Sequence, residues 1–297
     1  MNKGILLAFD DEADAAQRLA EAGGWPCQLV QRHRFPDGEF KLRLPATLPE
    51  RVIVFRGLHQ PNEKLVELLL VAQTARGLGA QHLTLVCPYL GYMRQDIAFH
   101  PGEVVSQRVV GRFLASLFDA VVTVDPHLHR VATLAEAVPV ASPVVISGAP
   151  ALADWVARER PGALLLGPDE EAAQWVAQAA ARHGNDSAVC RKVRHGDRQV
   201  QIELPAMDWH DRAVVILDDV ASTGHTVALT TRLLLQAGAA SVDVAVTHAL
   251  FAGDALDVLR QAGVGQVWST DCIPHPTSVI PMAPLLAQAL HEVLSRP

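Results

Sequence analysis

The sequence predicts an α/β protein made of two similar tandem domains, each with a mostly parallel sheet flanked by helices. Short β-branched runs alternate with longer amphipathic runs along the 297 residues. Continuous apolar strands of this kind are typical of parallel sheets that are covered on both faces. Several segments also recur at a spacing of about 160 residues, which predicts an internal duplication.

The predicted elements alternate between strand and helix. Strands are predicted where short runs are rich in Val, Ile and Leu, at residues 5–9, 52–55, 83–87, 120–124, 164–166, 213–217, 242–247 and 266–269. Helices are predicted where apolar residues recur every three or four positions, at 11–22, 62–78, 106–118, 170–182, 226–237, 254–262 and 284–294. Gly79 and Gly238 each follow a helix and precede a strand, as C-cap glycines do.

Four pairs of matching segments carry the repeat. They are 51–56 with 212–217, 79–83 with 238–242, 10–13 with 169–172, and 38–45 with 197–205. We expect a first domain over residues 1–145 and a second over 146–297, joined near 142–150, with the last helix free to pack back on the first domain. Two unrelated α/β domains with a similar rhythm are the alternative.

Composition excludes several classes of protein. The chain is 49% hydrophobic and 19% charged, which is ordinary for a globular protein, and no apolar run is long enough to span a bilayer. A net charge of -7 argues against a nucleic-acid partner. The N-terminus lacks a signal-peptide pattern, and the four cysteines lie far apart without a CxxC pair. We therefore expect a cytoplasmic enzyme with buried thiols and no membrane partner.

The most informative segment follows the predicted strand 213–217. Two carboxylates come first, Asp218 and Asp219, then a turn of small residues, then a helix. A tight turn at a helix N-terminus binds anions, and carboxylates suit ribose hydroxyls or a hydrated Mg²⁺. The sequence therefore predicts a sugar-phosphate site at a strand end, with phosphate contacts from Ser222, Thr223, Gly224, His225 and Thr226. A plain acidic turn with an N-cap is the alternative.

This segment resembles the ribose-phosphate-binding loop of type I phosphoribosyltransferases and of the ribose-phosphate pyrophosphokinase family. That family often has an acid where this chain has Ser222 and a glycine where it has His225. Serine retains a phosphate donor, whereas His225 either points outward or narrows the loop. The first domain has residues 55–59 in the matching place, without acids or hydroxyls. A chain with two phosphoribosyltransferase-like domains, of which only the second has this loop, resembles the pyrophosphokinases. A simple phosphoribosyltransferase has only one such domain.

Two further segments resemble the family's ATP site. In the first, F-x-D-G-E, the resemblance implies that Phe35, Asp37 and Glu39 serve the ATP site of a neighbouring subunit, and therefore a homo-oligomer. Its alternative is a simple hairpin turn.

The second segment, P-Y-x-x-Y-x-R-Q-D at 88–96, implies that Arg94 binds ATP phosphates and that Gln95 and Asp96 contact the nucleotide. A surface loop with a structural Arg–Asp pair is the alternative. Relatives often carry basic residues where this chain has Ile97 and Ala98.

The resemblance also implies metal and catalytic groups. His127, in a D-x-H segment, matches a histidine that binds the Mg²⁺ of MgATP, although lone histidines are more often structural. Asp169 matches an aspartate near ribose 5-phosphate and metal, with a helix N-cap as its alternative. In the basic segment 191–198, Lys192 and Arg194 match cations that stabilise the transferring group, with a solvated basic turn as the alternative.

These motifs occur in family order from residue 35 to about 274, and GPDEEAAQWV with KVRHGDR resembles the archaeal-type branch. The resemblance implies Mg²⁺-dependent transfer of the β,γ-diphosphoryl group of ATP to the 1-hydroxyl of ribose 5-phosphate, giving phosphoribosyl diphosphate (PRPP) and AMP. A phosphoribosyltransferase that consumes PRPP and a catalytically silent regulatory homologue are the alternatives.

Overall fold

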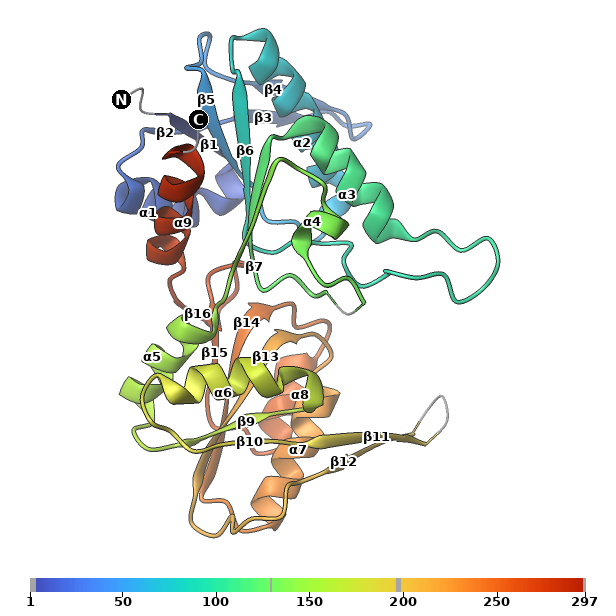
Figure 1. Ribbon diagram of the computed structural model, residues 1–297, viewed down its shortest axis with the longest axis vertical. Helices are drawn as coiled ribbons and strands as arrows, with labels where there is room; N and C mark the ends of the chain where they lie inside the picture. The colour runs from blue at the N-terminus through green and yellow to red at the C-terminus, as the bar shows by residue number, and fades with distance from the viewer. Residues whose placement is uncertain (1–3, 129, 196–198, 296–297) are drawn as a thin grey trace. The chain divides into compact units, whose positions relative to one another are not determined.

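The computed structural model describes residues 4–128, 130–195 and 199–295, and it describes side chains outside 193–201. The chain divides into two compact units. Unit 1 comprises Met1–Ile146 with Met282–Pro297, and unit 2 comprises Ser147–Pro281. The last helix of the chain thus belongs to unit 1, as the colour gradient in Figure 1 makes visible.

Unit 1 contains a six-stranded parallel sheet in the order β2-β1-β5-β6-β7-β8. Its strands are β1 (Ile5–Ala8), β2 (Cys27–Leu29), β5 (Arg51–Phe55), β6 (His82–Cys87), β7 (Ala120–Val124) and β8 (Ser142–Ile146). Its helical segments are η1 (Asp10–Glu12), α1 (Ala13–Gly23), α2 (Pro61–Gly77), α3 (Ser106–Leu117), α4 (Leu134–Ala137) and α9 (Ala283–Ser295). An antiparallel hairpin, β3 (Gln31–Arg34) with β4 (Phe40–Arg43), lies outside the main sheet.

Unit 2 contains a second six-stranded parallel sheet in the order β10-β9-β13-β14-β15-β16. Its strands are β9 (Leu164–Gly167), β10 (Ser187–Val189), β13 (Ala213–Ala221), β14 (Ser241–Ala249), β15 (Val267–Thr270) and β16 (Ser278–Ile280). Its helical segments are α5 (Ala149–Glu159), η2 (Glu170–Ala172), α6 (Ala173–Ala181), α7 (His225–Gln236) and α8 (Ala255–Gln261). A separate hairpin, β11 (Arg191–His195) with β12 (Gln199–Glu203), follows β10.

The two units share one topology. Each has its first strand followed by a short 3-10 turn, η1 or η2, and each inserts a hairpin between the second and third strands of its sheet. The strand orders are identical once the strands are counted within each unit. The predicted α/β fold class with two similar parallel-sheet domains is confirmed, and the shared order favours duplication over two unrelated domains.

The structure corrects several predicted boundaries. Residues 142–146, predicted to belong to the joining segment, form the edge strand β8, which pairs only with β7 and is largely half-buried. Such an edge strand lacks the continuous apolar run of a central strand. The short strands β2, β10 and β16 and the helices α4 and α5 were not predicted. Strand β13 extends to Ala221 through pairing with β14, so Asp218 and Asp219 lie inside the strand, not after it.

Alternation along β13 shows how unit 2 builds its core. Val214 and Ile216 face one apolar cluster with Leu234 of α7, whereas Val215 and Leu217 face another with Leu152 of α5. Successive strand residues point to opposite faces, so both faces are covered as far as Leu217. The strand then becomes polar, which places its carboxyl end at the edge of the covered layers. Among the described residues, no helix combines the length and the apolar character that a membrane span requires.

Candidate active site

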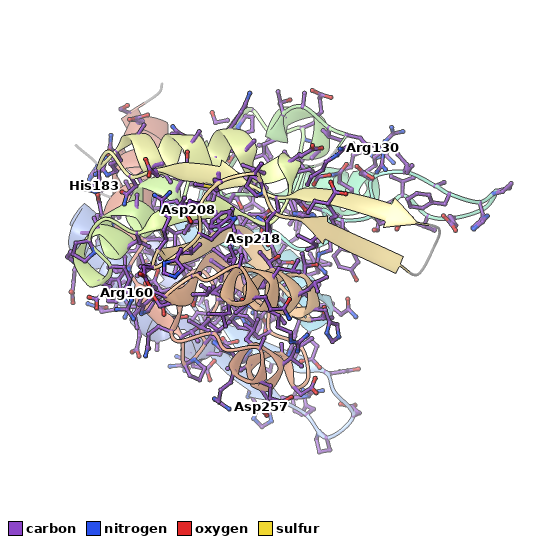
Figure 2. The ribbon with its side chains drawn as sticks, turned by 90° about the horizontal axis from the view of Figure 1, so that it is seen from below. Arg130, Arg160, His183, Asp208, Asp218 and Asp257 are labelled. Atoms are coloured by element: carbon purple, nitrogen blue, oxygen red, sulfur yellow. The ribbon has the colours of Figure 1, made fainter. Side chains whose placement is uncertain are left out.

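The carboxyl end of β13 carries two adjacent carboxylates, Asp218 and Asp219, both half-buried. The Asp219 backbone N–H donates to Asp218 Oδ1 at 2.9 Å. Burial raises the pKa of Asp218 well above its usual value, and the negative charges of Asp219 and Asp169 raise it further. Figure 2 labels Asp218 in this unit. A concentration of negative charge of this kind favours a ligand that brings hydroxyl donors or a cation.

The loop from Ser222 to Thr226 follows β13 and includes the first two residues of α7. Gly224 is the N-cap residue of α7 and has φ of 72°, a left-handed conformation that favours glycine. The Ala252 N–H donates to the Ser222 carbonyl at 3.0 Å, which braces the loop against the segment after β14. Thr223 is exposed, and Ser222 and Thr226 are half-buried. The loop therefore presents hydroxyls and a helix N-terminus together, an arrangement suited to phosphate.

His225 is exposed. Of the two orientations that the sequence left open, outward or into the loop, exposure favours the outward one. The imidazole then adds a side chain at the rim of this loop.

Lys192 and Asp169 complete this group in unit 2. Lys192 Nζ, on β11, lies 3.5 Å from Asp169 Oδ2, and the two side chains are 25% and 24% exposed. Asp169 occupies the N-cap position of η2 but makes no side-chain capping hydrogen bond. Its carboxylate instead pairs with Lys192, and its negative charge contributes to the raised pKa of Asp218. Arg194 lies in β11 opposite Val200, and its predicted side-chain role lies outside the described residues.

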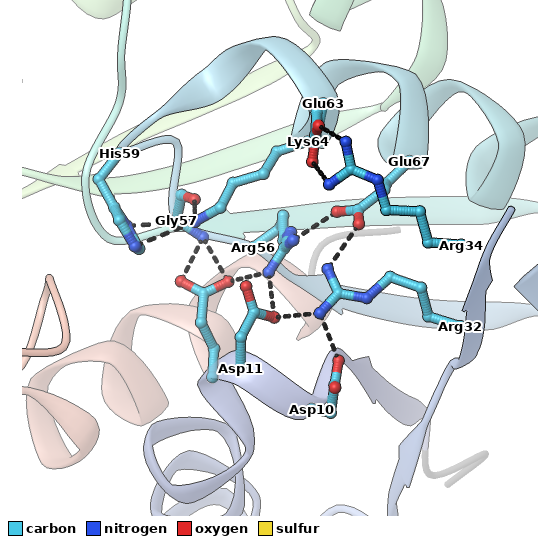
Figure 3. Close-up of polar contacts among 11 residues, drawn as sticks. Asp10, Asp11, Arg32, Arg34, Arg56, Gly57, His59, Glu63, Lys64 and Glu67 are labelled. Atoms are coloured by element: carbon cyan, nitrogen blue, oxygen red, sulfur yellow. Dashed lines mark hydrogen bonds and ion pairs between the residues drawn. The ribbon is translucent and has the colours of Figure 1, made fainter. Parts of the chain in front are cut away.

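Unit 1 has a buried ion cluster where unit 2 has its loop. Arg56, directly after β5, is 1% exposed, and its guanidinium donates to Asp11 Oδ1 at 2.6 Å and to Glu12 Oε2 at 2.8 Å. It also donates to Glu67 of α2, and Lys64 Nζ donates to the Gly57 carbonyl at 2.8 Å (Figure 3). Internal partners therefore occupy the place that the loop 222–226 has in unit 2.

Sequence reasoning did not identify this cluster. Its one local signal in the sequence is Arg56, a cation directly after an apolar strand. The matching strand of unit 2 is followed by the acids Asp218 and Asp219 instead. Its other members come from α2 and from the acidic residues after β1, so the cluster exists only once the sheet has formed.

The segment after β6 contains the predicted nucleotide-binding residues. Arg94 is exposed and has no ion pair among the residues that the structure describes. Gln95 Nε2 donates to the Ile97 carbonyl at 2.9 Å. Asp96 is buried, and it accepts the Arg130 backbone N–H at 3.1 Å and Arg130 Nη1 at 2.7 Å. Partial desolvation opposes ionisation, but these hydrogen bonds hold the pKa of Asp96 below its usual value.

A structural Arg–Asp pair is therefore present, but its arginine is Arg130, outside the segment 88–96, and Asp96 is buried and not part of a surface loop. Its carboxylate ties the segment after β6 to the segment after β7, which also contains the half-buried His127. Arg94, by contrast, remains available to a ligand.

The turn at 35–39 joins β3 to β4. The Phe35 N–H donates to the Glu39 carbonyl at 2.8 Å, and the Gly38 N–H donates to the Phe35 carbonyl at 2.9 Å. Gly38 has φ of 96°, which the turn requires. The side chains of Phe35, Asp37 and Glu39 are exposed. The structure confirms that the segment is a hairpin turn. The turn leaves the ring of Phe35 and the carboxylates of Asp37 and Glu39 exposed to solvent.

The described side chains contain no group of three or more His, Cys, Asp or Glu residues arranged to hold a metal ion. Mg²⁺ commonly binds through one or two carboxylates and completes its shell with water and substrate phosphates. The acidic end of β13, with Asp218 and Asp219, fits that partial ligand set.

Comparisons with known proteins agree with this geometry. Residues 5–117 match the N-terminal domain of ribose phosphate pyrophosphokinase, and residues 148–261 match the phosphoribosyl transferase domain. A ribose-phosphate pyrophosphokinase of Methanopyrus kandleri is 33% identical over 97% of this chain and 99% of its own, and ribose-phosphate pyrophosphokinase 1 of Archaeoglobus fulgidus is 34% identical over 96% and 99%.

A solved structure supports the same fold. The phosphoribosylpyrophosphate synthetase of Mycobacterium smegmatis superposes with a TM-score of 0.82, covering 98% of this chain and 99% of its own at 22% identity. The two matching domain models and the near-full-length relatives agree on one assignment. This chain belongs to the ribose-phosphate pyrophosphokinase family.

Proposed function

We propose that this protein synthesises PRPP by transferring the β,γ-diphosphoryl group of ATP to the 1-hydroxyl of ribose 5-phosphate, with AMP as the second product. The carboxyl end of β13 carries this proposal. Two carboxylates, a hydroxyl-rich loop and a helix N-terminus occur there in sequence, beside the Lys192–Asp169 pair. The names of the relatives supply the reaction class, and these residues supply chemistry that suits it.

Unit 2 binds ribose 5-phosphate in this proposal. Asp218 and Asp219 accept hydrogen bonds from ribose hydroxyls, and the loop 222–226 receives the 5-phosphate through backbone N–H groups and hydroxyls. Burial raises the pKa of Asp218, and the charges of Asp219 and Asp169 raise it further; a bound ligand that brings donors or a cation relieves that repulsion. Binding and charge compensation therefore favour each other at this strand end.

Unit 1 supplies groups for ATP. Arg94 has the rigid fork of donors that phosphate oxygens require, and its exposure leaves that fork free of internal partners among the described residues. Gln95 adds an amide to the same segment. Phe35, Asp37 and Glu39 present an aromatic face and two acceptors, which suit an adenine ring and its amino group. We propose that this turn serves ATP bound by a neighbouring subunit in a homo-oligomer.

Mg²⁺ is the proposed cofactor. Asp218, Asp219 and Asp169 would hold it on the sugar side and His127 on the nucleotide side, where it would neutralise phosphate charge.

The four cysteines form no disulfide, which supports a reducing compartment such as the cytoplasm.

The reaction breaks one bond and forms another. The oxygen of the anomeric hydroxyl attacks the β-phosphorus, the bond from that phosphorus to the α,β-bridging oxygen breaks, and AMP leaves with that oxygen. The hydroxyl proton passes to solvent. Such transition states are loose, so the protein contributes positioning and charge stabilisation more than proton transfer. Lys192 and Arg194 are the proposed cations for the transferring group.

The decisive experiment is AMP formation from ATP, measured with and without ribose 5-phosphate and with and without Mg²⁺. The proposal requires AMP and PRPP in equal amounts and only when both additions are present. Folded protein that forms no AMP would contradict it.

The same preparation separates the two alternatives. Pyrophosphate release from PRPP with a purine or pyrimidine base would identify a phosphoribosyltransferase. Binding of ATP or ribose 5-phosphate without either reaction would identify a silent homologue.

A further inference from the structure

The tip of the β3–β4 hairpin receives little support from packing. Leu42, opposite Arg32 in the hairpin register, is partly buried against the core of unit 1. Towards the turn, the hairpin instead overhangs a hollow of about 430 Å³, which residues 38–40 line on one side and Asn62, Val66 and Leu70 of α2 line on the other. Apolar contact therefore acts at the end of the hairpin away from the turn, where Arg32 also lies, and the turn extends beyond both.

Two arginines of β3 connect the hairpin to the rest of unit 1. Arg32 and Arg34 are two positions apart and so lie on one face of the strand. Arg34 pairs with Glu63 at 2.8 Å, but both side chains are more than half exposed, and such pairs contribute little. Arg32 differs, because its guanidinium donates to Glu67 Oε1 at 2.8 Å and to Asp10 Oδ1 at 2.7 Å, and Glu67 is fully buried.

Glu67 is shared between two cations. One carboxylate oxygen accepts from Arg32 of the hairpin, and the other accepts from Arg56 of the buried cluster (Figure 3). Arg56 is itself held by Asp11 and Glu12 and lies over the ring of Phe9 at 4.3 Å. The acceptor that Arg32 reaches is thus immobilised on its far side. A fixed acceptor limits the positions of the strand that carries the arginine.

We infer that Arg32 and Glu67 are positioning residues for the turn at 35–39. The buried cluster that replaces the phosphate loop in unit 1 then has a second use, which is to anchor the hairpin that carries Phe35, Asp37 and Glu39. Neither residue touches ATP in this inference. It rests on the proposed function, because the turn acts as an ATP contact only if the protein uses ATP.

The primary test is Arg32→Gln. When Arg32 is changed, buried Glu67 still pairs with Arg56, so the fold is expected to persist, whereas Glu67→Gln also weakens the partner set of buried Arg56. Arg32→Gln should speed amide hydrogen exchange in the segment 31–43. If the turn then occupies its binding geometry a tenth of the time, the KM for ATP rises about 10-fold, while the KM for ribose 5-phosphate stays unchanged.

Arg43→Gln is the matched control. It removes an equal charge from the same hairpin, at an exposed residue for which the structure records no ion pair among the described residues. Exchange and both KM values should stay as in the parent protein. The double variant Arg32→Gln/Glu67→Gln should raise the KM for ATP no more than the stronger single variant, because both changes break one contact.

Three results would overturn the inference. They are unchanged exchange in Arg32→Gln, faster exchange with an unchanged KM for ATP, and equal changes in both KM values together with a lowered melting temperature. Failure of the proposed function looks different, since the parent protein would then form no AMP. The exchange arm would still report whether Arg32 anchors the hairpin.

Discussion

Asp96→Asn separates two roles for one buried carboxylate. The sequence resemblance makes Asp96 a nucleotide contact, whereas the structure gives its carboxylate to Arg130, through the backbone N–H at 3.1 Å and Nη1 at 2.7 Å. Asparagine retains an oxygen for the backbone N–H but loses the charge that faces the guanidinium. If the role of Asp96 is to brace the segment through Arg130, the substitution lowers the stability of the protein. Any weaker binding of ATP then follows from a loosened segment around Arg94 and Gln95.

The expected loss follows from the geometry. A hydrogen bond to a charged group contributes about 1.5–3 kcal/mol. Because the Arg130 side chain is 53% exposed, solvent screening reduces this to about 1–2 kcal/mol. The pKa of Asp96 is lowered in the folded state, so this contribution is fully present above the unfolded pKa near 3.8 and is lost as pH falls through the folded pKa. Measurements near pH 7 therefore report all of it.

Urea unfolding is the assay. With a slope of roughly 2–3 kcal/mol per molar urea, the expected loss lowers the midpoint by about 0.5 M. Glu63→Gln is the control, because it breaks the exposed pair with Arg34 in the same unit and should cost less than about 0.5 kcal/mol. Arg130→Gln should destabilise to a similar extent, and the double variant should cost less than the sum. Unchanged stability with a raised KM for ATP would refute the brace and favour direct contact.

Three other predictions follow from the described geometry. Lys192→Ala should lower kcat for AMP formation about 10²–10³-fold with little change in melting temperature, and near-parent turnover would contradict its proposed role. Gly224→Ala should cost about 1–2 kcal/mol in urea unfolding, because φ is 72° and the new Cβ lies 3.3 Å from Leu259 Cγ, and unchanged stability would refute the strain. Burial, with the charge of Lys64, lowers the pKa of His59 to about 4, so stability should fall as pH drops from 6.5 towards 4. His59→Gln should flatten that decline, and an identical pH profile would exclude His59 as its source.

The fold class could be predicted because it depends on local periodicity. Apolar strands covered on both faces and helices with an apolar stripe are visible in one sequence, and so is the spacing that relates the two units. Edge strands could not be predicted equally well. Three of them, β2, β10 and β16, are only three residues long and pair with one neighbouring strand. Such short edge strands need no continuous apolar run, so the sequence shows no strand pattern there.

The site divides in the same way. The segment from Asp218 to Thr226 is contiguous, so its acids and hydroxyls could be predicted as one site, although the left-handed conformation of Gly224 and the extension of β13 to Ala221 came only from the structure. Asp96 shows the limit. Its partner lies 34 residues away, and the motif that contains Asp96 is compatible with both a nucleotide contact and a brace.

By itself, the sequence determined that the chain has two related α/β units, and it predicted a sugar-phosphate loop in one of them. Only the tertiary structure decided what occupies the matching place in the other unit. Arg56 meets Asp11, Glu12 and Glu67 there because parallel strands bring their carboxyl ends to one edge of the sheet, and side chains from distant segments converge at that edge. A charged group excluded from water requires partners, and those partners are selected by the assembled sheet, which no local pattern encodes.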